Sequence, residues 1–466
     1  MTMRWFTACV RRALCALVLL PPLLAGGAAP EAPRNVIILL ADGAAPTQWD
    51  FGRYSSRVLR QRGFATTDVV FREGTLGLLV TASANSYVTD SGAGGSALSI
   101  GEKVNNGTIS VTPDGRSPQT LMSVARGAGR RIGLVSTAAI YDASPAALSV
   151  NVQSRSDRQT IVDRYLELEP DVLMGGGRDL FLPAAAGGRR TDGRDVVAAF
   201  RTKGYEVVTD TAGLKAAQGR RLLGLFADGD MDFELDRDPA AQPSTAEMTR
   251  AALAALSQPG HQGFVLLVEN ENTDTAGHAN DAAALMHALW AFDEAVEVAL
   301  DFQKRHPDTL ILVVSDHETG GLSITYAQRE LSTVWSHTLF NPGEAQLRLI
   351  GGITCSFNWL IGELGPQPAP EALDRLLAQH YPGFRLDPDL RELFLKGQPL
   401  DRNFTYGRAN VLGRMVARQT GYYWGTSGHT PEPVAVGAIG PGAARFRGYQ
   451  DNTDFARHLR ALIEGR

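Results

Sequence analysis

The stretch from Gly263 to His278 constrains the fold of this chain more than any other. It begins with an apolar run that ends at Val268, and it then changes at once to Glu269, Asp274 and His278. A run this short and this apolar is typical of a strand that is buried in a sheet. Carboxylate and imidazole groups at the end of such a strand suit zinc, and carboxylates also suit magnesium. Taken alone, the stretch fits an ordinary polar loop after a strand equally well.

Similar apolar runs recur along the chain and alternate with helix-like segments. One such segment, from Asp281 to Lys304, carries apolar residues at helical spacing. Alternating strands and helices predict an α/β fold, a three-layer α/β/α sandwich with a large, mostly parallel central sheet. The other predicted strands are Asn35–Leu40, Arg131–Ser136, Thr309–Ser315 and Pro433–Ile439.

Three of the predicted strands are followed by residues that can bind a metal. Asp42 follows the first strand, Glu269 follows Val268, and Asp316 with His317 follows the strand that ends at Ser315. In a parallel sheet, the carboxyl ends of the strands meet at one edge, where ligands gather. The sequence therefore predicts that these side chains face one another in a metal site.

A serine in a run of small residues is the candidate nucleophile. Ser91 follows Asp90 and precedes Gly-Ala-Gly-Gly, and the next residues can open a helix. A serine at a helix start lies among free backbone N–H groups that favour anions. An ordinary capping serine is the alternative. The Gly-x-Ser-x-Gly elbow is absent around Ser91, so activation by a metal is favoured over a Ser-His-Asp triad.

The first 29 residues read as a secretory signal peptide. Arginines precede an apolar stretch from Ala13 to Leu24, and small residues follow it. We therefore expect a periplasmic or secreted protein with no membrane span after signal removal. Cys355 is then the single cysteine left, which excludes an internal disulfide and a thiolate metal site. The net charge of -5, with acidic and basic residues interspersed, predicts no nucleic-acid surface.

The domain organisation is predicted as one catalytic domain with a long insertion. The catalytic part covers residues 30–320 and 425–466, and the insertion covers 321–424 near the mouth of the active site. The insertion is rich in aromatic, proline and glycine residues and has amphipathic stretches at 371–380 and 387–396. It is equally consistent with a substrate lid and with a structural addition, and Trp335 and His337 within it are candidates to reach the pocket.

The chain resembles the alkaline phosphatase family, and the resemblance extends from Asn35 to the carboxyl end except in the insertion. The individual motifs are weak, but their combination is specific. The matching segments are Asn35-Val-Ile-Ile-Leu-Leu-Ala-Asp42-Gly, Val88-Thr-Asp-Ser91, Glu102-Lys-Val-Asn-Asn-Gly107, Asp142-Ala-Ser144-Pro-Ala-Ala, Ser154-Arg155, Asp171-Val-Leu-Met-Gly-Gly-Gly177, Glu269 with Asp274 and His278, Asp316-His317 and Gly428-His429-Thr.

The resemblance implies two zinc ions and one magnesium ion as cofactors. It assigns Asp274, His278 and His429 to one zinc ion, and Asp42, Asp316 and His317 to the other. It assigns Asp42, Ser144 and Glu269 to magnesium.

The resemblance also implies hydrolysis of small phosphate monoesters through a phosphoserine at Ser91. Arg155 would hold the phosphate, and Asp142 would lie in the same substrate site. Two positions depart from many relatives: Ser144 replaces threonine, and Thr275 stands where lysine, histidine or tryptophan is common. A phosphodiesterase or phosphotransferase of the same superfamily, and an exported phosphate- or metal-binding protein without turnover, are the alternatives. A homodimer is left open.

Overall fold

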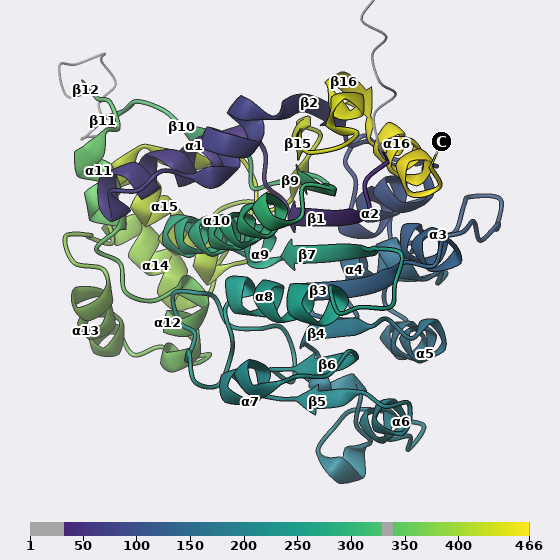
Figure 1. The fold of residues 1–466 in the computed structure, drawn as a ribbon. Helices are drawn as coiled ribbons and strands as arrows, with labels where there is room; N and C mark the ends of the chain where they lie inside the picture. Colours follow the sequence, from purple (N-terminus) through teal and green to yellow (C-terminus); the bar gives the residue numbers. More distant parts are fainter. Residues whose placement is uncertain (1–31, 329–338, 466) are drawn as a thin grey trace, which may run out of the picture. The chain divides into compact units, whose positions relative to one another are not determined.

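A ten-stranded sheet forms the centre of the computed structural model, which describes residues 32–328 and 339–465 (Figure 1). Nine strands run in one direction and β15 runs antiparallel to both of its neighbours. The strands, in spatial order, are β16 (Gly448–Asp451), β2 (Thr75–Val80), β15 (Val434–Ile439), β8 (Thr309–Val314), β1 (Asn35–Ala41), β7 (Phe264–Asn270), β3 (Arg131–Ala139), β4 (Val172–Gly176), β6 (Leu222–Leu225) and β5 (Glu206–Val208).

The central strands are buried on both faces, as their continuous apolar sequences require. In β1, Ile37 and Leu39 belong to one hydrophobic cluster, whereas Val36, Ile38 and Leu40 belong to the other. This alternation follows from the two-residue repeat of a strand whose two faces are both covered.

Helices cover the two faces and complete the three layers, so the predicted fold class is confirmed. The cluster of Ile37 includes residues of α1 (Pro46–Ser55), α7 (Thr211–Ala216), α8 (Thr245–Leu256), α9 (Asn272–Ala279) and α10 (Ala282–Arg305). The cluster of Val36 includes residues of α2 (Ser91–Ile100), α3 (Leu121–Gly127), α4 (Ala143–Ser149), α5 (Arg158–Leu168), α6 (Val196–Thr202) and α16 (Asn452–Ile463).

The segment predicted as an insertion is largely helical and joins the same core as α10. Its helices are α11 (Glu344–Ile350), α12 (Phe357–Leu364), α13 (Pro370–His380), α14 (Pro388–Lys396) and α15 (Arg408–Thr420). Small two-stranded sheets pair β10 (Leu322–Ile324) with β13 (Tyr422–Trp424), β11 (Ala327–Gln328) with β12 (Leu339–Phe340), and β9 (Glu318–Thr319) with β14 (His429–Thr430). Short helical turns cover Ser56–Arg60, Thr66–Phe71, Arg178–Leu180, Ala184–Ala186 and Ala443–Phe446.

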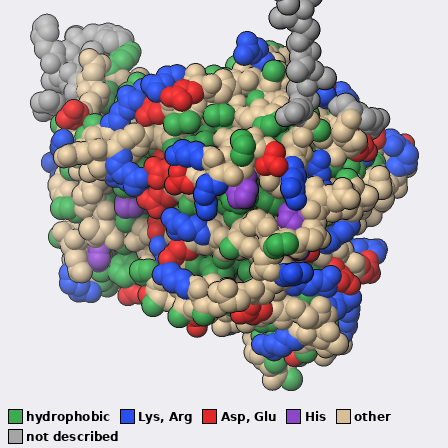
Figure 2. Space-filling view, viewed as in Figure 1, with side chains coloured by type: hydrophobic (Ala, Val, Ile, Leu, Met, Phe, Trp, Pro, Cys, Tyr) green, Lys and Arg blue, Asp and Glu red, His purple; other side chains and the backbone are tan. Residues whose placement is uncertain are grey.

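The predicted domain boundaries at residues 320 and 424 stay a prediction. The described residues from 32 to 465 belong to one compact unit. The predicted signal peptide and the candidates Trp335 and His337 lie outside the described residues. Among the helices of the described part of the chain, none has the length and apolar character to cross a bilayer. On the face shown in Figure 2, acidic and basic side chains are interspersed.

Candidate metal centre and nucleophile

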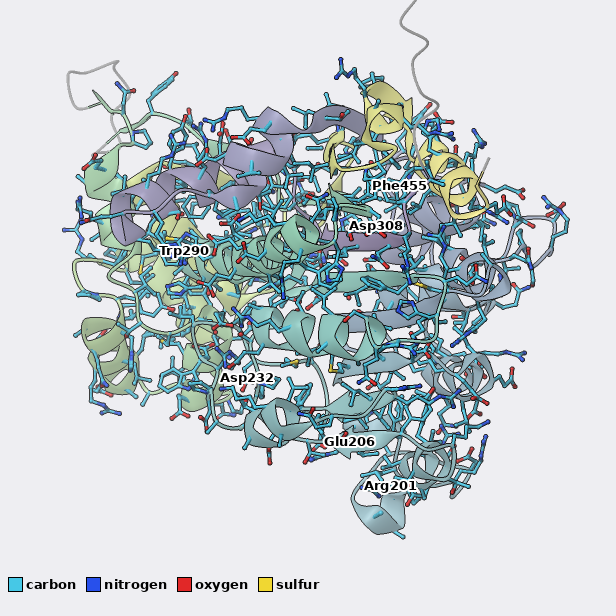
Figure 3. All side chains as sticks on the ribbon, viewed as in Figure 1. Arg201, Glu206, Asp232, Trp290, Asp308 and Phe455 are labelled. Atoms are coloured by element: carbon cyan, nitrogen blue, oxygen red, sulfur yellow. The ribbon has the colours of Figure 1, made fainter. Side chains whose placement is uncertain are left out.

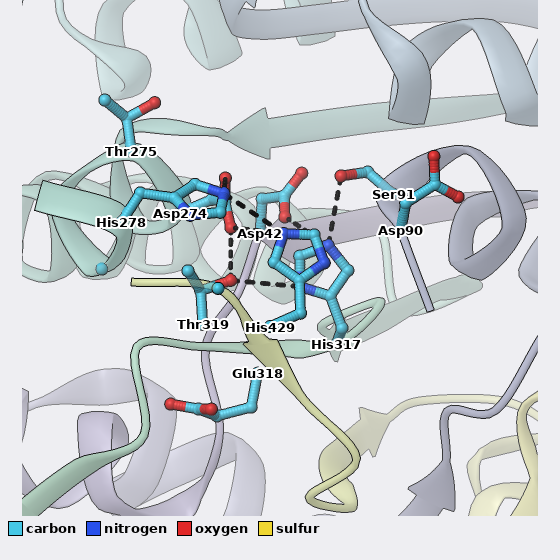
Figure 4. A network of polar contacts seen from close by, with 12 residues as sticks. Asp42, Asp90, Ser91, Asp274, Thr275, His278, His317, Glu318, Thr319 and His429 are labelled. Atoms are coloured by element: carbon cyan, nitrogen blue, oxygen red, sulfur yellow. Dashed lines mark hydrogen bonds and ion pairs between the residues drawn. The ribbon is translucent and has the colours of Figure 1, made fainter. Parts of the chain in front are cut away.

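Five of the predicted metal-binding residues meet at the carboxyl edge of the central strands, namely Asp42, Asp274, His278, His317 and His429 (Figure 4). Strands β7 and β8 flank β1 in parallel register, with Leu40 opposite both Glu269 and Val314. Asp42 and the Asp316-His317 pair therefore leave the sheet beside Glu269. His429 differs from these residues because it precedes a strand, β15, instead of following one. Since β15 is antiparallel, its first residues lie at the edge where its neighbours end.

One group of donor atoms comes from α9 and from β14. Asp274 and His278 are four residues apart on α9 and therefore share a face of that helix, with Nε2 of His278 3.1 Å from Oδ2 of Asp274. Nε2 of His429 lies 3.2 Å from Nε2 of His278 and 3.6 Å from Oδ1 of Asp274. The three side chains converge closely enough to bind one cation.

A second group lies against the first and is fully buried. Nε2 of His317 is 3.4 Å from Oδ1 of Asp42 and 3.3 Å from Oδ2 of Asp316. The rings of His317 and His429 stack with centroids 3.6 Å apart, so the two groups are adjacent. The tightest convergence in this second group joins Asp42, His317 and Asp274, so Asp274 is shared by both groups.

The hydrogen bonds of the three histidines turn every Nε2 atom toward the centre. Nδ1 of His278 contacts the carbonyl oxygen of Ser427 at 2.6 Å, and Nδ1 of His429 contacts the carbonyl oxygen of Thr89 at 2.8 Å. The hydroxyl of Thr319 donates to Asp274 and thus accepts at 3.2 Å from Nδ1 of His317. With Nδ1 protonated in each ring, each Nε2 keeps its lone pair, which is the arrangement found in metal-binding histidines.

Two buried oxygen atoms of this centre have no hydrogen-bond partner in the part of the chain that the structure describes. They are Oδ1 of Asp42 and Oδ2 of Asp316, and both belong to side chains that are almost fully buried. A buried carboxylate oxygen without a donor is costly unless a cation faces it. Together with the lone pairs of the imidazoles, these atoms fit divalent metal ions.

Glu269 lies beside Asp42 with two serine hydroxyls. The hydroxyl of Ser144, at the start of α4, donates to Oδ2 of Asp42 at 3.1 Å, and the hydroxyl of Ser136 donates to Glu269. The sequence did not reveal Ser136, because a serine inside an apolar strand has no recognisable signal. An all-oxygen set of this kind suits magnesium.

Burial and mutual repulsion perturb the acid groups of the centre. Burial raises the pKa of Glu269 to about 8 and the pKa of Asp316 to about 7. Burial, reinforced by the charge of Asp316, also raises the pKa of Asp42 well above its usual range. For Asp274, burial is outweighed by His278 and the other histidines, so its pKa is lowered. Bound cations would lower the pKa of the acids that burial raises, and would hold all four carboxylates ionised.

Ser91 is the first residue of α2, and its side chain points into the centre. Its Oγ atom lies 3.1 Å from Nε2 of His317. The capping residue of this helix is Asp90, whose Oδ1 atom accepts from the backbone of Ala93 at 2.9 Å. The alternative that Ser91 is itself the cap is therefore wrong, and its hydroxyl is free for another role.

The glycines after Ser91 bring α2 close to its surroundings. A Cβ atom at Gly94 would lie 3.0 Å from the backbone oxygen of Asp316, and one at Gly95 would lie 3.1 Å from the side chain of Ala147 in α4. The small residues thus hold Ser91 beside the metal-binding side chains.

Arg155 lies between two carboxylates next to Ser91. Its Nη1 atom is 3.1 Å from Oδ2 of Asp90, and its Nη2 atom is 3.3 Å from Oδ1 of Asp142. Asp90 also accepts from the backbone N–H of Gly107 at 3.0 Å. The guanidinium is therefore held beside Asp90, the residue that directly precedes Ser91.

The region predicted as an insertion reaches this centre. Tyr406 stacks on the ring of His278 with centroids 4.9 Å apart. Asn410, in α15, donates to the carbonyl oxygen of His278 at 2.9 Å and to the side chain of Asn280 at 2.7 Å. These contacts help to fix His278, and neither residue stood out in the sequence.

Comparison with known proteins identifies the family. The family described as alkaline phosphatase matches residues 33–464. The chain belongs to the alkaline phosphatase family. It is thus an enzyme of a metal-dependent phosphatase family, in agreement with the resemblance of its motifs and with the converging donor groups.

Relatives and solved structures agree with this assignment. The chain is 28% identical to alkaline phosphatase 4 of Bacillus subtilis, over 92% of this chain and 89% of the relative. It is 36% identical to the repressible alkaline phosphatase of Saccharomyces cerevisiae, over 62% of this chain and 55% of the yeast protein. The crystal structure of Thermus thermophilus alkaline phosphatase matches with a TM-score of 0.84 and 31% identity, covering 96% of each chain.

Proposed function

We propose that this protein is an exported phosphomonoesterase that hydrolyses phosphate monoesters through a phosphoserine at Ser91. The observation that carries the proposal is the 3.1 Å contact between Oγ of Ser91 and Nε2 of His317. This contact places the hydroxyl of Ser91 beside the converging donor groups. The hydroxyl has no other role in the fold.

The donor sets support two zinc ions and one magnesium ion. Asp274, His278 and His429 would hold one zinc ion. Asp42 and Asp316, which both lie close to Nε2 of His317, would hold the other together with His317. Asp42, Ser144 and Glu269 would hold magnesium. When bound, the cations neutralise phosphate charge, lower the pKa of the serine hydroxyl and stabilise the departing alcohol.

The residues of the chain itself position the substrate and carry the covalent step. The planar guanidinium of Arg155 would donate two hydrogen bonds to the phosphate. Its contacts with Asp90 and Asp142 keep it oriented. The N-terminus of α2 adds backbone N–H groups near the phosphate. Oγ of Ser91 attacks phosphorus as the bond to the alcohol breaks. Water then cleaves the serine–phosphorus bond and releases inorganic phosphate.

Replacing the nucleophile tests this proposal. In Ser91→Ala we expect turnover of an aryl phosphate to fall at least about 10³-fold, because the covalent path is lost. The zinc and magnesium content should stay the same. Exposed Ser117→Ala is the matched control. Full activity in Ser91→Ala would remove Ser91 from the nucleophile role, and a loss of metal would show a structural role instead.

The alternative of a phosphodiesterase is tested with paired substrates. The cluster of Glu269, Ser144 and Asp42 favours the monoesterase, because the diesterase needs no magnesium site. We expect faster hydrolysis of an aryl phosphate monoester than of the corresponding diester, and the reverse would overturn this choice. A protein with bound metal and no turnover of either substrate would be a binding protein.

Export and assembly are separate parts of the proposal. The arginine-flanked apolar stretch before residue 30 predicts that the mature protein lacks it. N-terminal sequencing of protein from the periplasm or medium tests this, and a mature chain that retains the stretch would contradict it. Light scattering distinguishes a monomer from a homodimer.

A further inference from the structure

A second acidic region, which we call the acidic groove, lies beside the candidate metal centre. It has a volume of about 450 Å³. Its lining contains four carboxylates and one tryptophan, and it contains no lysine, arginine or histidine. The lining residues that the argument uses are Asp230, Asp232, Asp236, Glu271, Thr275 and Trp359.

Two connections place the acidic groove next to the position of the substrate. Thr275 directly follows Asp274, whose group would stabilise the departing alcohol. Asp230 accepts from the backbone N–H of Ala139 at 2.8 Å, and the carbonyl of Ala139 accepts from Asp142 at 2.7 Å. Because Asp142 also contacts Arg155, a short series of hydrogen bonds links the acidic groove to the proposed phosphate position.

The side chain of Glu271 gives the acidic groove a buried carboxyl oxygen that no described residue contacts by a hydrogen bond. About nine-tenths of this residue is buried. Its Oε1 atom accepts from the hydroxyl of Thr275 at 2.5 Å, whereas its buried Oε2 atom has no hydrogen-bond partner within residues 32–328 and 339–465. A buried carboxylate oxygen of this kind is stabilised by a positively charged ligand.

The chemistry of the acidic groove favours an organic cation over a metal ion. Among the described residues, three donor atoms converge within 4.8 Å only in the two groups of the metal centre, so these four carboxylates do not meet at one point. Trp359 is 37% exposed and offers an aromatic face, which attracts ammonium groups. Spread carboxylates and an aromatic ring suit an alkylammonium group.

We propose that the acidic groove binds a positively charged alcohol portion of the substrate, so that the preferred substrates are phosphate monoesters of ammonium-bearing alcohols. The proposal rests on the proposed phosphomonoesterase function. The cation of the substrate would pair with Glu271 and Asp230, offsetting the repulsion between these carboxylates and the phosphate. The covalent chemistry at Ser91 is unchanged.

A pair of substrates that differ only in charge tests the proposal. Choline phosphate and 3,3-dimethylbutyl phosphate have nearly the same shape, and the second lacks the positive charge. We expect the wild-type enzyme with its metals to show a kcat/KM for choline phosphate about 10-fold higher, with the preference falling as salt rises. Equal values for the two esters would overturn the proposal and leave the phosphomonoesterase function intact.

Variants of the acidic groove show which residues cause the preference. Asp230→Asn and Asp232→Asn should each reduce the ratio of the two kcat/KM values about two- to five-fold, the range for a partly exposed ion pair. The matched control is Asp308→Asn, just before β8 at the opposite edge of the sheet, which removes the same charge (Figure 3).

The controls separate the two proposals. An unchanged ratio in the Asp230→Asn/Asp232→Asn double variant would overturn the role of the acidic groove. If the wild-type protein hydrolysed neither ester, the proposed function would fail. Choline binding, measured by calorimetry, would then decide on the groove: weaker binding in the double variant supports it, and undiminished or absent binding overturns it.

Discussion

In the candidate metal centre, donor atoms from distant parts of the chain converge, whereas the carboxylates of the acidic groove stay apart. The centre combines three imidazoles with buried carboxylates, and each imidazole is oriented by a hydrogen bond at Nδ1. The acidic groove contains carboxylates and a tryptophan without an imidazole. The comparison teaches that the number of acidic residues does not define the ligand. Convergence and the fixed direction of the lone pairs distinguish a metal site from a surface for an organic cation.

Removal of the metals should have the largest effect and distinguish the two regions directly. We expect a chelator to reduce turnover of an aryl phosphate at least about 10³-fold, because charge stabilisation at phosphorus would be lost. Zinc and magnesium together should restore it. The measurement is activity during stepwise addition of each metal to the stripped protein.

A groove variant provides the control for this experiment. Asp232→Asn should need the same metals at the same concentrations as the wild type, because the acidic groove does not hold them. Full activity in the stripped wild-type protein would contradict the metal centre. A changed metal requirement in Asp232→Asn would contradict the separation of the two regions.

Thr319 provides a smaller and more specific test of the fixed lone pairs. Its hydroxyl contacts both Asp274 and Nδ1 of His317, and Thr319→Val removes it with little change of shape. We expect zinc affinity to fall about 10- to 100-fold, as for other residues that orient metal ligands. Zinc titration of the stripped protein measures this.

The matched control for Thr319→Val is Thr202→Val on the exposed side of α6. Its hydroxyl contacts a backbone carbonyl of its own helix. Equal zinc affinity in the wild type and in Thr319→Val would show that the direction of His317 is fixed by packing alone.

The sequence predicted the strands and their edge because buried parallel strands have a strong local signature. Asp42, Glu269 and Asp316 directly follow or end such strands, so topology alone brings them together. His429 was found through the family resemblance. Its position depends on the antiparallel direction of β15, which the apolar run 433–439 does not encode.

Residues that orient the site were harder to predict than the donor groups. Ser136, Thr319 and Tyr406 act through contacts between segments far apart in the sequence, and their residue types are common in strands and loops. The acidic groove was also not predicted. Its carboxylates come from the loop after β6 and from the start of α9, and their proximity appears only in the folded chain.

The smallest expected effect concerns a buried carboxylate far from both regions, Asp293 in α10. It accepts hydrogen bonds from the backbones of Ala65 and Thr66 and from the hydroxyl of Thr66. Burial raises the pKa of Asp293 to about 6. The folded state therefore keeps the proton up to a higher pH than the unfolded state, whose aspartate has a pKa near 4. The stabilising contribution is present below about pH 4 and is lost as pH rises through about 6.

Asp293→Asn isolates this contribution, because the variant stays neutral over the whole range. Between pH 4 and pH 7, the free energy of unfolding of the variant should increase by up to about 3 kcal/mol relative to that of the wild type, because only the wild type loses stability over this range. Urea unfolding of the chelated proteins measures this difference, so that metal loss at low pH does not contribute. Asp308→Asn controls for the loss of an exposed charge. A difference that stays constant with pH would show that the three hydrogen bonds to Asp293 offset its burial. In that case, a buried carboxylate would not need a cation as long as hydrogen bonds pair its oxygen atoms. The need would be limited to carboxylates with unpaired oxygen atoms, such as those of the metal centre.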